Sequence, residues 1–162
     1  MKASVGHAVV EELREQIARL EGRPARGRKT LPFGLGAIDK RLPGGGLALG
    51  ALHEVAGGGN GAIDGAAAAL FAPALAQAGL APDRVIYVEA GDDKTVLACI
   101  EEGLRHGSLG AVVAEVGRLS MTASRRLQLS AEGSGTIGIA LRRWRRQTEA
   151  VDFGQPTAAM TR

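Results

Sequence analysis

The chain has 162 residues and a formal net charge of +3, and this length predicts a single globular domain. Its 24 glycines have no three-residue period, which excludes collagen, and its one cysteine, Cys99, excludes an intrachain disulfide framework. No apolar run is long enough to span a bilayer, and the N-terminus becomes charged too early for a signal peptide. We therefore expect a cytoplasmic protein, whose positive charge favours an anionic partner.

The N-terminal region, residues 1–30, is predicted to consist of a helix and a basic linker. Apolar residues recur at helical spacing between Val9 and Leu20, with charged residues between them, as in an amphipathic helix. Residues 22–30 carry arginine, lysine, glycine and proline without a large apolar side chain, so they cannot form a core. At the other end, residues 147–162 are polar, and we expect a disordered or truncated tail.

The core is expected between these ends, over residues 31–146, where short apolar runs alternate with helical periodicity. A turn is predicted at Pro43–Gly46. Strands are predicted at 51–56, 84–90, 111–116 and 136–142. Helices are predicted at 63–79, 92–106 and 120–132, the second ending at Gly107. This alternation is typical of an α/β fold of three layers, with helices on both faces of a mostly parallel sheet.

A glycine-rich segment follows the first predicted strand, where a phosphate-binding loop would lie. It consists of Gly57, Gly58, Gly59, Asn60 and Gly61. A Walker loop also needs a lysine for the β- and γ-phosphates and a hydroxyl for magnesium, but no Lys, Ser or Thr occurs between Gly57 and Phe71. We therefore predict a degenerate loop that serves as a strand-to-helix turn and binds no cofactor, with residual nucleotide binding as the alternative.

Glu115 ends the 111–116 strand, where a Walker B carboxylate would hold magnesium. Because the loop lacks its lysine, we favour a carboxylate that reaches solvent or pairs with a neighbouring arginine. His53 and Glu54 lie side by side in the first strand, and we expect hydrogen-bonded structural residues there.

Catalytic and metal-binding patterns are missing from the sequence. The remaining candidates, His7, Cys99, His106, Ser124 and Ser134, are scattered and have no spacing typical of metal ligands or of a nucleophile with its base. We therefore expect no catalytic residue, no metal and no enzymatic activity.

The most distinctive surface feature is a cluster near the C-terminus that consists of Arg142, Arg143, Trp144, Arg145 and Arg146. Four guanidinium groups can neutralise phosphates, and an indole can stack on a base, as in proteins that bind single strands. The alternative is a solvated arginine-rich strand end whose tryptophan packs on the sheet or on a partner protein. For Arg125 and Arg126, on the last predicted helix, we favour a plain solvated face.

Several runs of the sequence resemble a known family. Residues 13–61 resemble the entry into the RecA ATPase core. More specifically, the chain resembles the ImuA proteins, which are bacterial damage-inducible relatives of RecA. The resemblance covers about residues 31–143, most of the chain, and its most specific runs are RLPGGGL and TASRRLQL. Compared with a RecA core, a strand and turn after Phe71 and the C-terminal strands are missing, so we expect a chain shortened at both places.

The resemblance implies a RecA-like accessory protein without catalysis, acting in SOS mutagenesis and translesion DNA synthesis. The partners that it implies are an ImuB-like protein related to Y-family polymerases and an error-prone C-family DNA polymerase, with RecA as a further candidate. Two alternatives stay open. One is a degenerate recombinase that still binds ATP and single-stranded DNA, and the other is a cell-division inhibitor similar to SulA.

Overall fold

The computed structural model describes residues 28–57, 82–144, 148 and 154–162. The helices predicted at 9–20 and 63–79 lie outside these residues. The chain divides into two compact units, Met1–Leu49 and Gly50–Arg162, whereas the sequence placed its boundaries after residues 30 and 146. Each unit is described by itself.

The first unit contains a two-stranded antiparallel sheet of β1 (Thr30–Leu31) and β2 (Leu47–Ala48). Between them lie the short helix α2 (Gly36–Asp39) and the 3₁₀ turn η1 (Pro43–Gly45). Gly44 and Gly45 have φ values of 71° and 79°, which glycine adopts without strain. A Cβ atom on Gly46 would lie 2.4 Å from the carbonyl oxygen of Leu31. The predicted turn at 43–46 is confirmed, and its glycines are required by backbone geometry.

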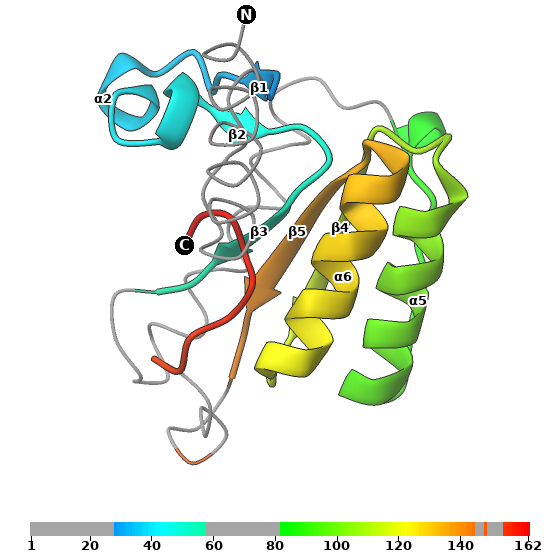
Figure 1. The fold of residues 1–162 in the computed structure, drawn as a ribbon. Helices are drawn as coiled ribbons and strands as arrows, with labels where there is room; N and C mark the ends of the chain where they lie inside the picture. The colour runs from blue at the N-terminus through cyan, green and yellow to red at the C-terminus, as the bar shows by residue number, and fades with distance from the viewer. Residues whose placement is uncertain (1–27, 58–81, 145–147, 149–153) are drawn as a thin grey trace, which may run out of the picture. The chain divides into compact units, whose positions relative to one another are not determined.

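The second unit is built on a three-stranded parallel sheet of β3 (Leu52–Val55), β4 (Ala111–Val116) and β5 (Ile137–Arg142). The strand order is β3-β5-β4 (Figure 1), so the last strand in the sequence lies in the middle. β5 is buried along its whole length, which explains its almost uninterrupted apolar sequence. Three of the four predicted strands are confirmed, and the arrangement is an α/β fold.

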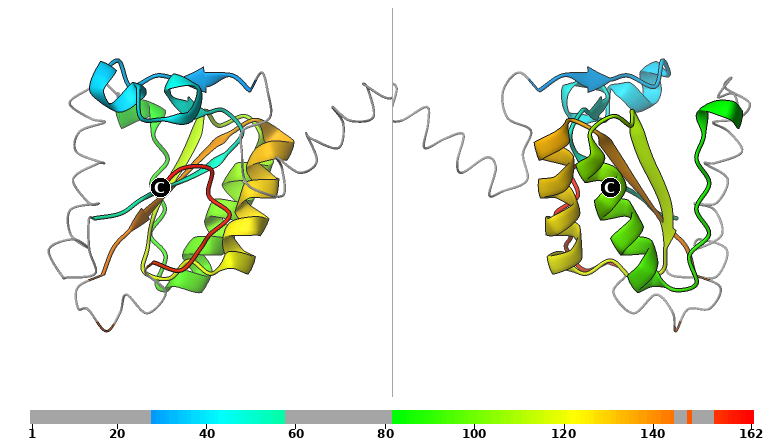
Figure 2. Two further views of the ribbon diagram at one scale, coloured as in Figure 1. Left: turned by 60° about the vertical axis from the view of Figure 1, so that its left-hand side comes forward. Right: turned by 90° about the vertical axis from the view of Figure 1, so that its right-hand side faces the viewer.

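Two helices of equal length, α5 (Asp93–His106) and α6 (Met121–Ser134), lie side by side against one face of this sheet (Figure 2). Gly107 and Gly135 end them in the left-handed conformation, and the predicted stop at Gly107 is confirmed. A second helical layer, which the sequence predicts from residues 63–79, falls outside the described residues. No helix in the described part of the chain is long and apolar enough to cross a bilayer.

The core lies between the two helices and the sheet. It is formed by buried apolar side chains from all five of these elements and from the loop before α6. They are Leu52, Ile100, Leu104, Val116, Leu119, Leu127, Ala131 and Ala140. The helical spacing of Ile100 and Leu104 on α5 places both side chains on the face that packs against β4.

The prediction of a buried strand at 84–90 is wrong. Residues 82–84 form the 3₁₀ turn η3 (Pro82–Arg84), and residues 85–90 belong to no strand. Ile86, Tyr87 and Val88 are exposed, Tyr87 to 83%. The β-branched run has a high local preference for a strand, but a strand also needs a neighbour to complete its hydrogen bonds, and none of the described strands pairs with it.

The N-terminus of α5 supplies a pH-dependent contribution to stability. The Asp92 carboxylate accepts a hydrogen bond from the backbone N–H of Thr95 at 2.7 Å, and this bond lowers the pKa of Asp92 below its ordinary value of 3.8. The stabilisation is therefore present above pH 3.8 and is lost as the pH falls through the lower pKa of the folded state.

The Asp92→Asn variant keeps an acceptor at the same position but cannot titrate. We expect the difference in unfolding free energy between the two proteins to be constant near neutral pH. In acid, the wild type is expected to lose stability relative to the variant. Urea unfolding at a series of pH values measures it, and a difference that is independent of pH would exclude this cap as the source.

Candidate functional site

The carboxyl ends of the three parallel strands meet at one edge of the sheet, which is the usual place for ligands in open α/β folds. The register pairs Val55 with Leu141, and Val116 with Arg142. The residues at and just beyond these strand ends include two carboxylates, Glu54 and Glu115, and several arginines.

A buried ion pair joins the two strand ends at this edge. Arg142 on β5 donates from Nη1 to Oε1 of Glu54 on β3 at 2.8 Å, and both side chains are fully buried. The second nitrogen, Nη2, donates to the carbonyl oxygen of Gly117 at 3.0 Å. The other carboxylate oxygen of Glu54 accepts from the Thr157 hydroxyl at 2.9 Å. The pair is thus held by hydrogen bonds to two other parts of the chain, and Nε of Arg162 lies 3.6 Å from Oε1 of Glu54.

The C-terminal residues run along the outer edge of β3. Met160 donates its backbone N–H to the carbonyl of Leu52 at 2.7 Å, and Glu54 donates to the carbonyl of Thr161 at 2.9 Å. His53 Nδ1 lies 2.7 Å from the Thr161 hydroxyl. Within the polar tail predicted over 147–162, Thr157, Met160 and Thr161 hydrogen-bond to residues of β3. His53 and Glu54 are hydrogen-bonded structural residues, as expected.

A shallow pocket of about 450 Å³ lies beyond the ends of β4 and β5. Its walls include the ion pair between Arg143 and Glu115, whose nitrogen and oxygen lie 2.5 Å apart. Asp93, at the start of α5, accepts backbone N–H groups from Gly117 at 3.2 Å and from Arg118 at 2.8 Å. The side chains of Asp93, Glu115 and Arg143 are therefore already engaged with other groups of the protein.

Glu115 follows the interpretation favoured from the sequence, because it pairs with a neighbouring arginine. In the described part of the chain, no three His, Cys, Asp or Glu side chains gather as a metal would require. Of the carboxylates at this sheet edge, Glu54 and Glu115 form ion pairs with arginines, and Asp93 accepts backbone hydrogen bonds.

The structure divides the residues of the predicted surface cluster. Arg142 is fully buried, and Trp144 is 2% exposed, so neither side chain is offered to a ligand at the surface. Arg143 is accessible, with 43% of its side chain exposed. Arg145 and Arg146 lie outside the described residues. Trp144 is buried within the chain, and what its indole packs against stays a prediction.

Of the glycine-rich segment, only Gly57 is described, two residues after the end of β3. Gly58, Gly59, Asn60 and Gly61 lie outside the described residues. The strand that precedes this segment was predicted correctly, and its carboxyl end points to the edge described above.

Sequence reasoning missed two features of this edge. It treated Glu54 and Arg142 separately, although an arginine directly after the buried run IGIAL is a signal that its charge needs a partner inside the protein. It also missed Asp93, whose signal is weaker, because adjacent aspartates before a helix are mostly explained as caps.

Comparison with known proteins places the chain in a family. No protein-family model matches it. The chain is 37% identical, over 140 residues, to Protein ImuA of Caulobacter vibrioides strain NA1000 / CB15N, and the match covers 70% of the chain. Protein ImuA of Caulobacter vibrioides strain ATCC 19089 / CIP 103742 / CB 15 matches to the same extent.

The chain belongs to the ImuA family. The predicted resemblance is therefore confirmed. The match covers 57% of each relative, so this ImuA-family chain spans little more than half the length of the curated relatives it matches.

Proposed function

We propose that this ImuA-family chain is a RecA-like accessory protein without catalysis that acts in SOS-induced mutagenesis and translesion DNA synthesis in the cytoplasm. Its proposed partners are an ImuB-like protein and an error-prone C-family DNA polymerase. In this proposal the chain contributes binding surfaces, and the polymerase carries out the chemistry.

The observation that carries the proposal is the state of the two strand-end carboxylates. A RecA-like ATPase needs a carboxylate that is available for magnesium and a lysine that holds the phosphates. Here Glu54 is enclosed with Arg142, and Glu115 is paired with Arg143, while the glycine-rich segment lacks a lysine. The parallel sheet with the order β3-β5-β4 supports a RecA-like framework that has lost its ligand.

Calorimetric titration with a non-hydrolysable ATP analogue and magnesium tests the absence of nucleotide binding. We expect no heat of binding at a protein concentration of about 100 μM. At that concentration the titration detects dissociation constants of roughly the same size or smaller. Magnesium-dependent binding that is lost in Arg143→Ala would contradict the proposal. Such binding would favour the degenerate recombinase, with the nucleotide in the pocket that Arg118 and Arg143 line.

Co-purification tests the proposed partners. We expect the tagged chain, co-expressed with an ImuB-like protein and a C-family polymerase, to retain at least one of them after washing at physiological salt. A tagged chain with the buried pair disrupted, Arg142→Met, serves as the misfolding control. Retention of neither partner, together with filamentation of cells on overexpression without DNA damage, would favour the division inhibitor similar to SulA.

A further inference from the structure

The outer face of α6 carries an alternating apolar and basic stripe. Met121, Arg125 and Leu129 follow one another at intervals of four residues, so they lie on one face of the helix. Met121 is 46% exposed and Leu129 is 55% exposed, although apolar residues on a helix of this kind usually face the core. Two large apolar side chains are thus left on the surface, with an arginine between them.

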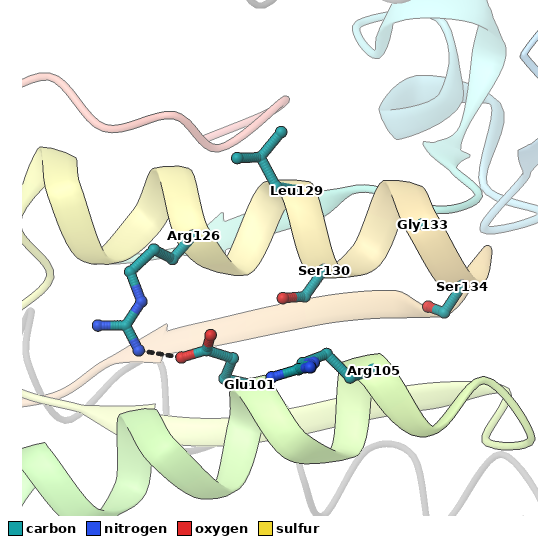
Figure 3. A pocket seen from close by; sticks show the side chains of 7 residues that line it. All are labelled: Glu101, Arg105, Arg126, Leu129, Ser130, Gly133 and Ser134. Atoms are coloured by element: carbon teal, nitrogen blue, oxygen red, sulfur yellow. Dashed lines mark hydrogen bonds and ion pairs between the residues drawn. The ribbon is translucent and has the colours of Figure 1, made fainter.

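A groove of about 420 Å³ between α5 and α6 adjoins this stripe, and Leu129 belongs to both (Figure 3). Arg126 and Glu101 point toward one another across the groove and form an ion pair. Arg105 also lines the groove, and neither it nor Arg125 makes an ion pair with any described residue. Glu132, which is exposed on the same face of α6 seven residues after Arg125, adds a second carboxylate. The groove and stripe therefore carry three arginines and two glutamates, an excess of one arginine.

The shape of the groove leaves room for another chain. Gly133 lines it, and a Cβ atom built on that glycine would meet nothing within 4 Å. Ser130 contributes a small hydroxyl side chain to the same wall. Small residues at this place keep the surface open along the last two turns of α6.

We propose that this surface, formed by the stripe and the groove, binds an acidic amphipathic helix of a partner protein. Apolar side chains of such a helix, spaced two turns apart, would cover Met121 and Leu129, and carboxylates between them would pair with Arg125 and Arg105. Recognition of an amphipathic helix by matching anchors at this spacing is a common binding mode. The inference rests on the proposed function only in assigning the helix to a mutagenesis partner.

A peptide fits this surface better than a nucleic acid does. A phosphate backbone offers nothing apolar to cover the exposed side chains of Met121 and Leu129. An acidic helix supplies both kinds of contact, because its carboxylates and its apolar side chains alternate on one face.

Fluorescence anisotropy tests the proposal with the full chain and a labelled helical peptide of glutamate, alanine and leucine, whose leucines match the spacing of Met121 and Leu129. We expect saturable binding at physiological salt. We expect Arg105→Ala combined with Arg125→Ala to weaken it by about tenfold, and Leu129→Ser to weaken it by a similar factor. The matched control Arg84→Ala changes an exposed arginine outside this surface and is expected to leave the affinity within about twofold.

Two control peptides separate charge from shape. One has glutamine in place of glutamate, and the other has the same composition in a scrambled order, and we expect both to bind at least about tenfold more weakly. The proposal would be overturned if the scrambled peptide bound as tightly as the designed one, or if Arg84→Ala weakened binding as much as the double arginine variant. Displacement of the peptide only by oligothymidylate would also overturn it, in favour of a nucleic-acid surface.

The outcome is separable from the test of the proposed function. If an ImuB-like partner co-purifies but no acidic peptide binds, the proposed surface is wrong and the proposed function stands. If the peptide binds as expected and no mutagenesis partner co-purifies, the surface stands and the proposed function is wrong.

Discussion

Replacing Arg142 by methionine is expected to lower the free energy of unfolding by about 3–5 kcal/mol, the usual cost of removing one partner of a buried ion pair. The change leaves the Glu54 carboxylate enclosed, with its Arg142 partner gone at a position where both side chains are fully buried. It also removes the hydrogen bond to the carbonyl of Gly117, so the loop after β4 loses a tether. Urea unfolding followed by circular dichroism measures the loss.

A second variant distinguishes the buried charge from general damage to the core. The penalty comes from a buried charge that the remaining cation, Arg162 at 3.6 Å, compensates only in part. Glu54→Leu combined with Arg142→Met is therefore expected to be clearly more stable than Arg142→Met alone. The control Arg143→Met removes a half-exposed pair with Glu115, which is expected to cost at most about 1 kcal/mol. A double variant that is less stable than the single one would show that the charge is not the cause.

Local periodicity predicted most of the second unit. Helical spacing predicted α5 and α6 to within two residues at each end, and the predicted stop at Gly107 ends α5. Strand pairing is not local, which is why 84–90 was predicted as a strand and 154–162 was not predicted to pack. The first has the right residues without a described neighbour, and the second has few strand-forming residues but a neighbour in β3.

The site was harder to predict than the fold. Glu54 and Arg142 are separated by 88 positions, so no spacing in the sequence relates them, and each was interpreted alone. The pairing of Glu115 could be anticipated because Arg143 follows the strand that neighbours it. The exposed apolar stripe on α6 also escaped prediction, since helical periodicity does not distinguish the exposed Met121 and Leu129 from buried apolar residues of the same helix.

Replacing Trp144 by alanine is expected to destabilise the second unit by about 3–5 kcal/mol, the typical cost of deleting a large buried aromatic side chain. Trp144 is the only tryptophan and is 2% exposed, so the folded protein should emit at short wavelength and resist quenching by acrylamide. Trp144→Phe keeps most of the buried volume and is expected to cost clearly less. Quenchable, long-wavelength tryptophan emission from the wild-type protein, together with unchanged stability of Trp144→Ala, would instead place the indole at the surface.

This burial changes how DNA binding by the arginine cluster should be tested. A variant that removes every arginine of the cluster includes Arg142, whose loss is expected to unfold the sheet edge, and it would lose binding for a trivial reason. The informative variant is Arg143→Ala with Arg145→Ala and Arg146→Ala, which leaves the buried pair and Trp144 intact. If the cluster contacts single-stranded DNA, this variant binds more weakly and its affinity depends less steeply on salt, because fewer phosphates are neutralised. Unchanged binding to an oligothymidylate across a salt series would exclude that contact.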